Sequence, residues 1–195
     1  GLKLLYPSTP DNKEPVEYYS RGFRKNITSN RIGAQRALDL LLAKIQDRPF
    51  TSELELPKFD RVASASPVKN LSKSKIAVIT TGGLVPKGNP DNLPSTKAIT
   101  YAKYPLGEME KLESMNYEVQ HGGYSTNDVK QDPNRLVPLD VLRSFEYEGR
   151  IAKVHDYFYT FSGCSTYYEF ATEIGRDIAK DLCNHEIDAA IITSA

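Results

Sequence analysis

The chain has 195 residues, and its 25 Lys and Arg residues balance 25 Asp and Glu residues, so the formal net charge is zero. Hydrophobic residues make up 39% and charged residues 26%, which is ordinary for a globular protein with one sizeable core. A neutral chain is poorly suited to neutralise phosphates, and no apolar run reaches the roughly 18 residues that a membrane-spanning helix needs. We therefore expect neither a nucleic-acid partner nor a membrane span.

The N-terminus lacks the layout of a signal peptide, so we expect a cytoplasmic protein. Cys164 and Cys183 belong to no C-x-x-C pair, which argues against a disulfide framework or a zinc site. His121, His155 and His185 include no pair at the i, i+4 spacing of a helical metal site. The sequence therefore predicts no bound metal.

Residues 1–72 are polar and rich in proline, apart from one strong helix signal. Apolar residues recur there at helical spacing, at Ala34, Ala37, Leu38, Leu41, Leu42 and Ile45. Ser29 or Asn30 is placed to cap the start of this helix, and Pro49 prevents much continuation. We interpret residues 1–72 as an N-terminal arm with one long helix that packs on another surface.

From residue 73 onward the pattern is that of an α/β domain. The expected elements are strand 76–81, helix 138–148, strand 151–161, a helix that follows the turn 162–165, and strand 187–193. Thr166 and Glu169 fit a capping box for the last helix, and Cys183 near its end is expected to be packing. Runs that are apolar on both faces are typical of parallel strands. The order of elements predicts a mostly parallel sheet with flanking helices.

A long irregular region, 82–138, follows the first strand and is rich in Gly, Pro, Asn and Asp. Loops of this length in a compact domain are more often functional than idle, and in α/β folds ligands bind beyond the carboxyl ends of strands. The last strand meets the end of the chain at Ala195. We expect an α/β domain over 73–195 that is truncated at its C-terminal end; a true edge strand is the alternative.

Several motifs occur in a specific order: the segment Thr80–Asp91, then His121–Tyr124, Asp132–Arg135, Pro138–Arg143, and the turn and helix near 162–184 followed by Ile187–Ala195. In this order they resemble the selenoprotein B subunit of the glycine, sarcosine and betaine reductases. The resemblance is good over 75–195 and less distinct over 1–74. In that family a stretch like U-G-T-C-T-R-C, where U is selenocysteine, directly follows the strand at 187–193. The resemblance implies an internal fragment that ends just before the selenocysteine, through termination at its UGA codon, trimming or proteolysis.

The resemblance also implies a reaction, the reductive cleavage of the C–N bond of glycine, sarcosine or betaine. In the family a pyruvoyl group on a partner subunit holds the amine in the glycine enzyme, and a selenolate attacks the α-carbon. The product passes to a small selenoprotein A. No cofactor is expected in this chain, which alone would be inactive. The turn Ser162–Thr166 differs from a G-N-G-T-like turn in the family, so the substrate stays open.

A carboxylate-bearing substrate needs cationic or N–H-rich anchors. Arg135 and Lys87 lie in matching loop segments, and Gly82 and Gly83 are candidates to present backbone N–H groups. The structural alternatives are an ion pair of Arg135 with Asp132 and a solvated surface charge at Lys87. Neither reading is excluded at this point.

His121 is the candidate general acid or base, because its pKa range suits protonation of a leaving amine; a loop histidine bonded to backbone is the alternative. Tyr124 is a candidate to stack or donate to the substrate, with a core role as its alternative. Cys164 precedes a helix N-terminus, where the helix dipole lowers a thiol pKa, and it is the remaining candidate nucleophile. His155 is expected to pack within its strand.

Two other functional interpretations compete with the reductase subunit. One is a ligand-binding or assembly module of the same family that never carries the nucleophile. The other is an unrelated α/β enzyme that uses Cys164 as its nucleophile. A truncated sheet would expose apolar surface, so a homo-oligomer or a contact through a strand edge is also expected.

Overall fold

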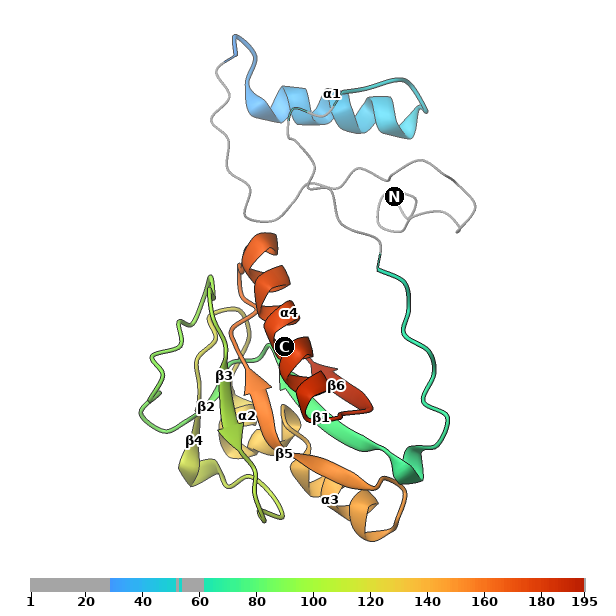
Figure 1. Cartoon of the computed structure of the whole chain (residues 1–195). Helices are drawn as coiled ribbons and strands as arrows, with labels where there is room; N and C mark the ends of the chain where they lie inside the picture. Colours follow the sequence, from blue (N-terminus) through green and yellow to red (C-terminus); the bar gives the residue numbers. More distant parts are fainter. Residues whose placement is uncertain (1–28, 52, 54–61, 195) are drawn as a thin grey trace. The chain divides into compact units, whose positions relative to one another are not determined.

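The computed structural model describes residues 29–51, 53 and 62–194, and the chain divides into two compact units, Gly1–Ala63 and Ser64–Ala195 (Figure 1). In the first unit, α1 spans Gly33–Ile45 and confirms the predicted helix. The capping prediction is wrong, because the N-cap is Ile32 and no side chain caps the helix. The interpretation of residues 1–72 as an arm stays a prediction, because residues 1–28, 52 and 54–61 lie outside the described residues.

The second unit contains a four-stranded sheet in the order β3-β5-β1-β6. The strands β1 (Lys75–Thr80), β5 (Lys153–Thr160) and β6 (Ala189–Thr193) are parallel, and β3 (Ala102–Pro105) pairs antiparallel with β5. The sheet is therefore mostly parallel, as the apolar runs predicted. The central strand β1 is buried, but the edge strand β6 is not, and its Ile192 is 68% exposed. The chain crosses from β5 over β1 to reach β6 through a helix, which is the βαβ connection.

Helices flank the sheet, α3 (Leu139–Tyr147) against one cluster of core residues and α4 (Tyr168–Asn184) against another. Alternation along the strands separates the two clusters. Val78 and Phe158 pack with α3, while Tyr159 packs with Ile174 and Ile178 of α4. Because both faces are covered, the central strand β1 is apolar on both sides, and Ala77 is 0% exposed.

The region 82–138 contains more regular structure than the sequence predicted. Its short elements are β2 (Leu84–Pro86), β3, β4 (Tyr117–Val119), α2 (Asn127–Gln131) and the 3-10 turns Ser114–Asn116 and Pro133–Arg135; a further 3-10 turn, Leu71–Lys73, precedes β1. The strands β2 and β4 form a separate antiparallel pair. Each has three residues, which is too short for a period of two to stand out in the sequence. Among the helices described in this chain, none is long and apolar enough to cross a bilayer.

A polar network lies between β5, β3 and α4. Tyr159 donates its hydroxyl to Asp181 Oδ2 at 2.6 Å, and Lys103 Nζ lies 2.6 Å from the same oxygen. His155 Nε2 lies 3.3 Å from the Tyr159 hydroxyl, and the His155 and His185 rings are 5.1 Å apart. His155 is 6% exposed, which confirms that it packs within its strand.

This network predicts that stability falls in mild acid. Burial lowers the pKa of His155, and the positive charges of His185 and Lys103 lower it further. The carboxylates of Asp156 and Asp181 raise this pKa, but by less. The unfolded chain therefore takes up more protons than the folded chain as pH falls through about 6.5. The contribution of His155 is complete above that pH and is lost below it. Thermal melts between pH 8 and 5.5 should show a steeper loss for the wild type than for His155→Gln, and equal slopes would contradict this role.

Candidate functional site

The carboxyl ends of three parallel strands lie side by side at one edge of the sheet. Thr80 of β1 is in register with Thr160 of β5 and Thr193 of β6, and the Thr81 N–H donates to the Thr193 carbonyl at 3.0 Å. Thr160 Oγ1 is buried and has no hydrogen-bond partner among the residues described here. In open α/β sheets this edge is where ligands bind, so the loops that leave it define the candidate site.

One short segment ties together the two loops that carry the predicted catalytic residues. The Ser95 carbonyl accepts from the Gly122 N–H at 2.9 Å and from the Ser162 hydroxyl at 2.7 Å. The Lys97 N–H donates to the Cys164 carbonyl at 2.7 Å. The loop before Gly123 and the turn after β5 are thus held to the same strip of chain. The sequence alone does not indicate the role of this segment, because that role rests on backbone groups that no side-chain pattern reveals.

Gly123 lies between the His121 ring and the Cys164 thiol. A Cβ atom built on Gly123 would lie 3.0 Å from His121 Cε1 and 3.1 Å from Cys164 Sγ. The two predicted catalytic residues, separated by 43 positions in the sequence (164 − 121), therefore flank one glycine. A Cβ at this position would require the ring and the thiol to shift by a few tenths of an ångström.

His121 is half-buried, and its Nδ1 accepts a hydrogen bond from the Gly123 N–H at 3.0 Å. Its ring lies 4.8 Å from that of Tyr124, whose hydroxyl donates to the Gly82 carbonyl at 3.1 Å. Burial lowers the pKa of His121, so the imidazole is neutral at neutral pH. The structure thus brings His121, Tyr124 and Gly82 into one connected group.

Gly82 and Gly83 allow close approach of the chain to its neighbours. The Gly82 N–H donates to Thr80 Oγ1 at 3.1 Å, so anion binding by this amide would require that bond to break. Gly83 has φ +69° and its carbonyl accepts from the Gln120 N–H at 2.7 Å. Gly83 thereby positions Gln120, the residue directly before His121.

Lys87 and Arg135 have exposed side chains. In the described part of the chain, no hydrogen bond or ion pair joins either side chain to His121 or Cys164. The alternative ion pair of Arg135 with Asp132 is not formed among those residues either. Instead the Asp132 carboxylate accepts from the Asn134 N–H at 3.0 Å and from its side-chain amide at 2.9 Å.

Two residues without glycine's freedom adopt left-handed backbone at the contact of these loops. Lys97 has φ +53° and Ser165 has φ +55°. Such conformations cost on the order of 1–3 kcal/mol each and cluster at functional sites.

The capping box prediction is wrong, because Thr166 Oγ1 instead donates to the Ser162 carbonyl at 2.7 Å and accepts from the Ala98 N–H at 3.1 Å. Thr166 therefore ties loops together.

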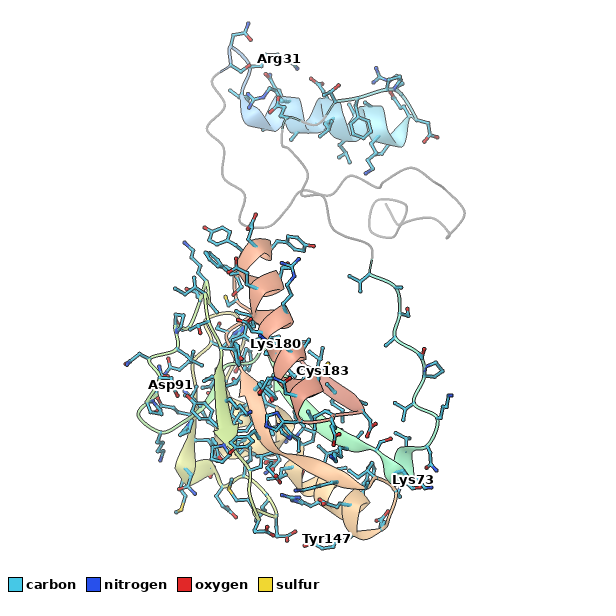
Figure 2. All side chains as sticks on the ribbon, viewed as in Figure 1. Arg31, Lys73, Asp91, Tyr147, Lys180 and Cys183 are labelled. Atoms are coloured by element: carbon cyan, nitrogen blue, oxygen red, sulfur yellow. The ribbon has the colours of Figure 1, made fainter. Side chains whose placement is uncertain are left out.

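Cys164 is half-buried in the turn before α4, and its Sγ lies 4.0 Å from the Ser165 hydroxyl. Cys183, labelled on α4 in Figure 2, is exposed, so the packing prediction for it is wrong. It lies five residues after the buried Ile178, which turns it away from the sheet. Among the residues that the structure describes, no three His, Cys, Asp or Glu side chains are grouped to hold a metal ion.

Comparisons with known proteins give consistent matches. The family described as glycine/sarcosine/betaine reductase selenoprotein B matches residues 3–195. A glycine reductase complex component B subunit gamma from Carboxydothermus hydrogenoformans is 45% identical over 100% of this chain and 45% of its own length.

Two relatives come from Peptoclostridium acidaminophilum. A betaine reductase complex component B subunit beta is 42% identical over 83% of this chain and 37% of its own length. A sarcosine reductase complex component B subunit beta is 37% identical over 91% and 41%. The chain thus spans less than half the length of these curated relatives. No solved structure matches it significantly.

Proposed function

Because the chain belongs to the selenoprotein B family of the glycine, sarcosine and betaine reductases, we propose that it forms part of the substrate-binding component of such a reductase. The observation that carries this proposal is the meeting of His121, Tyr124 and Cys164 at the carboxyl ends of β1, β5 and β6. Membership in the family removes the interpretation as an unrelated thiol enzyme. The relatives differ in the substrate that their names give, so the substrate class is a small α-amino carboxylate, N-methylated or not.

The residues present indicate which parts of the proposed reaction this chain would contribute and which a selenocysteine and a partner subunit would supply. For C–N cleavage, a selenocysteine after β6 would supply the nucleophile. A pyruvoyl group on a partner subunit would bind the amine. The described residues support this, because the β6 end bonds to Thr81, and a Cβ on Gly163 would lie 3.0 Å from Thr81 Cβ. A segment that continues from β6 would therefore start beside the turn that carries Cys164. The residues of this chain bind and orient the substrate.

The same proposal names the partners: a pyruvoyl-containing subunit, a small selenoprotein A and the amino-acid substrate, in the cytoplasm. Within this chain, His121 and Cys164 would contact the reacting substrate, and Gly82, Gly83 and Tyr124 would shape the pocket around it. Lys87 and Arg135 are proposed to attract the anionic substrate from the exposed loops.

The gene tests the proposal directly. We expect the codon after Ala195 to be UGA, followed by codons for a Gly-Thr-Cys-like run, and the full-length subunit with its partners to release amine from glycine, sarcosine or betaine. An ordinary stop codon would refute the catalytic proposal and favour a ligand-binding or assembly module of the same family.

Substitution at Gly123 tests the site itself. In the assembled reductase, Gly123→Ala should reduce kcat/KM by about tenfold, because the ring and the thiol must shift by a few tenths of an ångström, and a full ångström costs about 100-fold. The new methyl group would press on both His121 and Cys164. Gly175→Ala is the matched control, because a Cβ at this position on α4 meets nothing within 4 Å. Equal activity of the two variants would show that these residues do not form the site.

A further inference from the structure

The hydrogen bond to His121 fixes which ring nitrogen carries the proton. The Gly123 N–H points at Nδ1 from 3.0 Å, and a backbone amide can only donate. Nδ1 must therefore present its lone pair, and in the neutral ring the proton is on Nε2. The assignment holds for the ring orientation of the structure, in which Nδ1 and not Cδ2 faces the Gly123 amide.

The same bond opposes a positive charge on the ring. Protonation of Nδ1 would place two N–H donors against each other, and burial of the ring also lowers the pKa of His121. A neutral ring in this tautomer has no lone pair on Nε2 and is a very weak acid there. His121 is thus poorly placed for proton transfer and well placed to donate a hydrogen bond.

In the described part of the chain, no acceptor lies within hydrogen-bond distance of Nε2, while Tyr124, on the same loop, already donates to Gly82. The neighbouring amides of Gly122, Gly123 and Lys97 are also engaged with protein acceptors. The Nε2–H group is therefore a free donor that the site offers to a ligand.

We infer that His121 binds the carboxylate of the substrate through Nε2–H and does not transfer protons; this inference rests on the proposed function. The chemistry of the substrate class identifies the end that is bound. An ammonium group has only N–H donors, and a quaternary ammonium has neither donor nor acceptor, so neither pairs with an N–H group. The carboxylate is the acceptor common to glycine, sarcosine and betaine, and its charge strengthens the bond.

The first test is NMR of the full chain labelled with ¹⁵N-histidine, which reads the tautomer without any activity. We expect His121 as the Nε2–H tautomer at neutral pH, with its Nε2–H resonance shifted by acetate and unchanged by tetramethylammonium. These two probes represent the two ends of betaine. An Nδ1–H tautomer, or no response to acetate, would overturn the inference. Acetate binding without reductase activity in the assembled complex would instead refute only the proposed function.

Two substitutions separate hydrogen bonding from proton transfer. Glutamine can place an amide N–H near the Nε2 position but cannot act as an acid or base at neutral pH. His121→Gln should keep the Kd for acetate, measured from ligand signals, within about threefold, while His121→Ala should weaken it at least about tenfold. In the assembled reductase, His121→Ala should raise KM by a larger factor than it lowers kcat, and His121→Gln should recover most of the loss in KM. Loss of kcat with an unchanged KM in the Gln variant would return His121 to the role of a general acid or base.

Discussion

Replacing Gly83 by alanine is expected to destabilise the α/β unit by more than about 3 kcal/mol, a loss in the range of severe core defects. Two causes add up. The backbone at Gly83 is left-handed, with φ +69°, which alone costs an alanine about 1–2 kcal/mol. The new Cβ would also lie 2.0 Å from the Gln120 carbonyl oxygen, a backbone atom that cannot rotate away. Urea denaturation followed by circular dichroism measures the loss.

Gly149 offers a closely matched control. Its φ is also +69°, but a Cβ there meets nothing within 4 Å. Gly149→Ala should therefore cost only the conformational part, about 1–2 kcal/mol. The difference between the two variants isolates the close approach of Gly83 to Gln120, and equal losses would show that this approach is absent in solution.

The effect of Gly83 reaches the site because Gln120 directly precedes His121. Relief of the clash would move the start of the His121 loop away from the sheet, and the bond of Gln120 N–H to the Gly83 carbonyl would be lost. A Gly83→Ala protein that still folds should then bind acetate weakly. The sequence indicates Gly82 and Gly83 as candidates for anion binding. In the structure, the role of Gly83 is to let the backbone of Gln120 approach closely.

Long periodic elements were predictable from the sequence, and the contacts between loops were not. α4 was predictable because Ile174 and Ile178 recur at helical spacing, and β1 because its run is apolar on both faces. The strand β3 was missed, since its four residues end in Pro105 and leave little alternation to detect. Alternation over four residues covers only two periods, which is too few to distinguish a strand from an irregular segment.

The site itself was predictable as a set of residues and not as a geometry. The chemistry of His121 and Cys164 and their positions in loops make them candidates. They flank Gly123 because the Ser95 carbonyl bonds to both loops and the Lys97 N–H bonds to the Cys164 carbonyl. Backbone hydrogen bonds between irregular segments leave no periodic trace in a sequence. The tautomer of His121 likewise depends on a glycine amide, whose direction is a property of the folded loop.

Asp181→Ala should destabilise the protein by about 2–3 kcal/mol, because one carboxylate satisfies two groups at once. Without it, Tyr159, which is 0% exposed, and the Lys103 ammonium both lose an acceptor at 2.6 Å. Lys103 would then remain beside the Tyr157 ring, with its charge unpaired. Thermal and urea unfolding at pH 7 give the magnitude.

Two further variants and a pH series make the Asp181 prediction specific. Asp177→Ala, one turn earlier on α4 and exposed, should change stability by less than about 0.5 kcal/mol. Asp181→Asn keeps an acceptor for Tyr159 and should lie between wild type and Asp181→Ala. Burial raises the pKa of Asp181, but the hydrogen bonds from Lys103 and Tyr159 outweigh it and lower the pKa overall. The advantage of the wild type over Asp181→Asn should therefore be complete above pH about 4 and shrink as pH falls further. An advantage that persists unchanged at lower pH would mean that the charge of Asp181 contributes nothing, and that its shape alone holds Tyr159 in place.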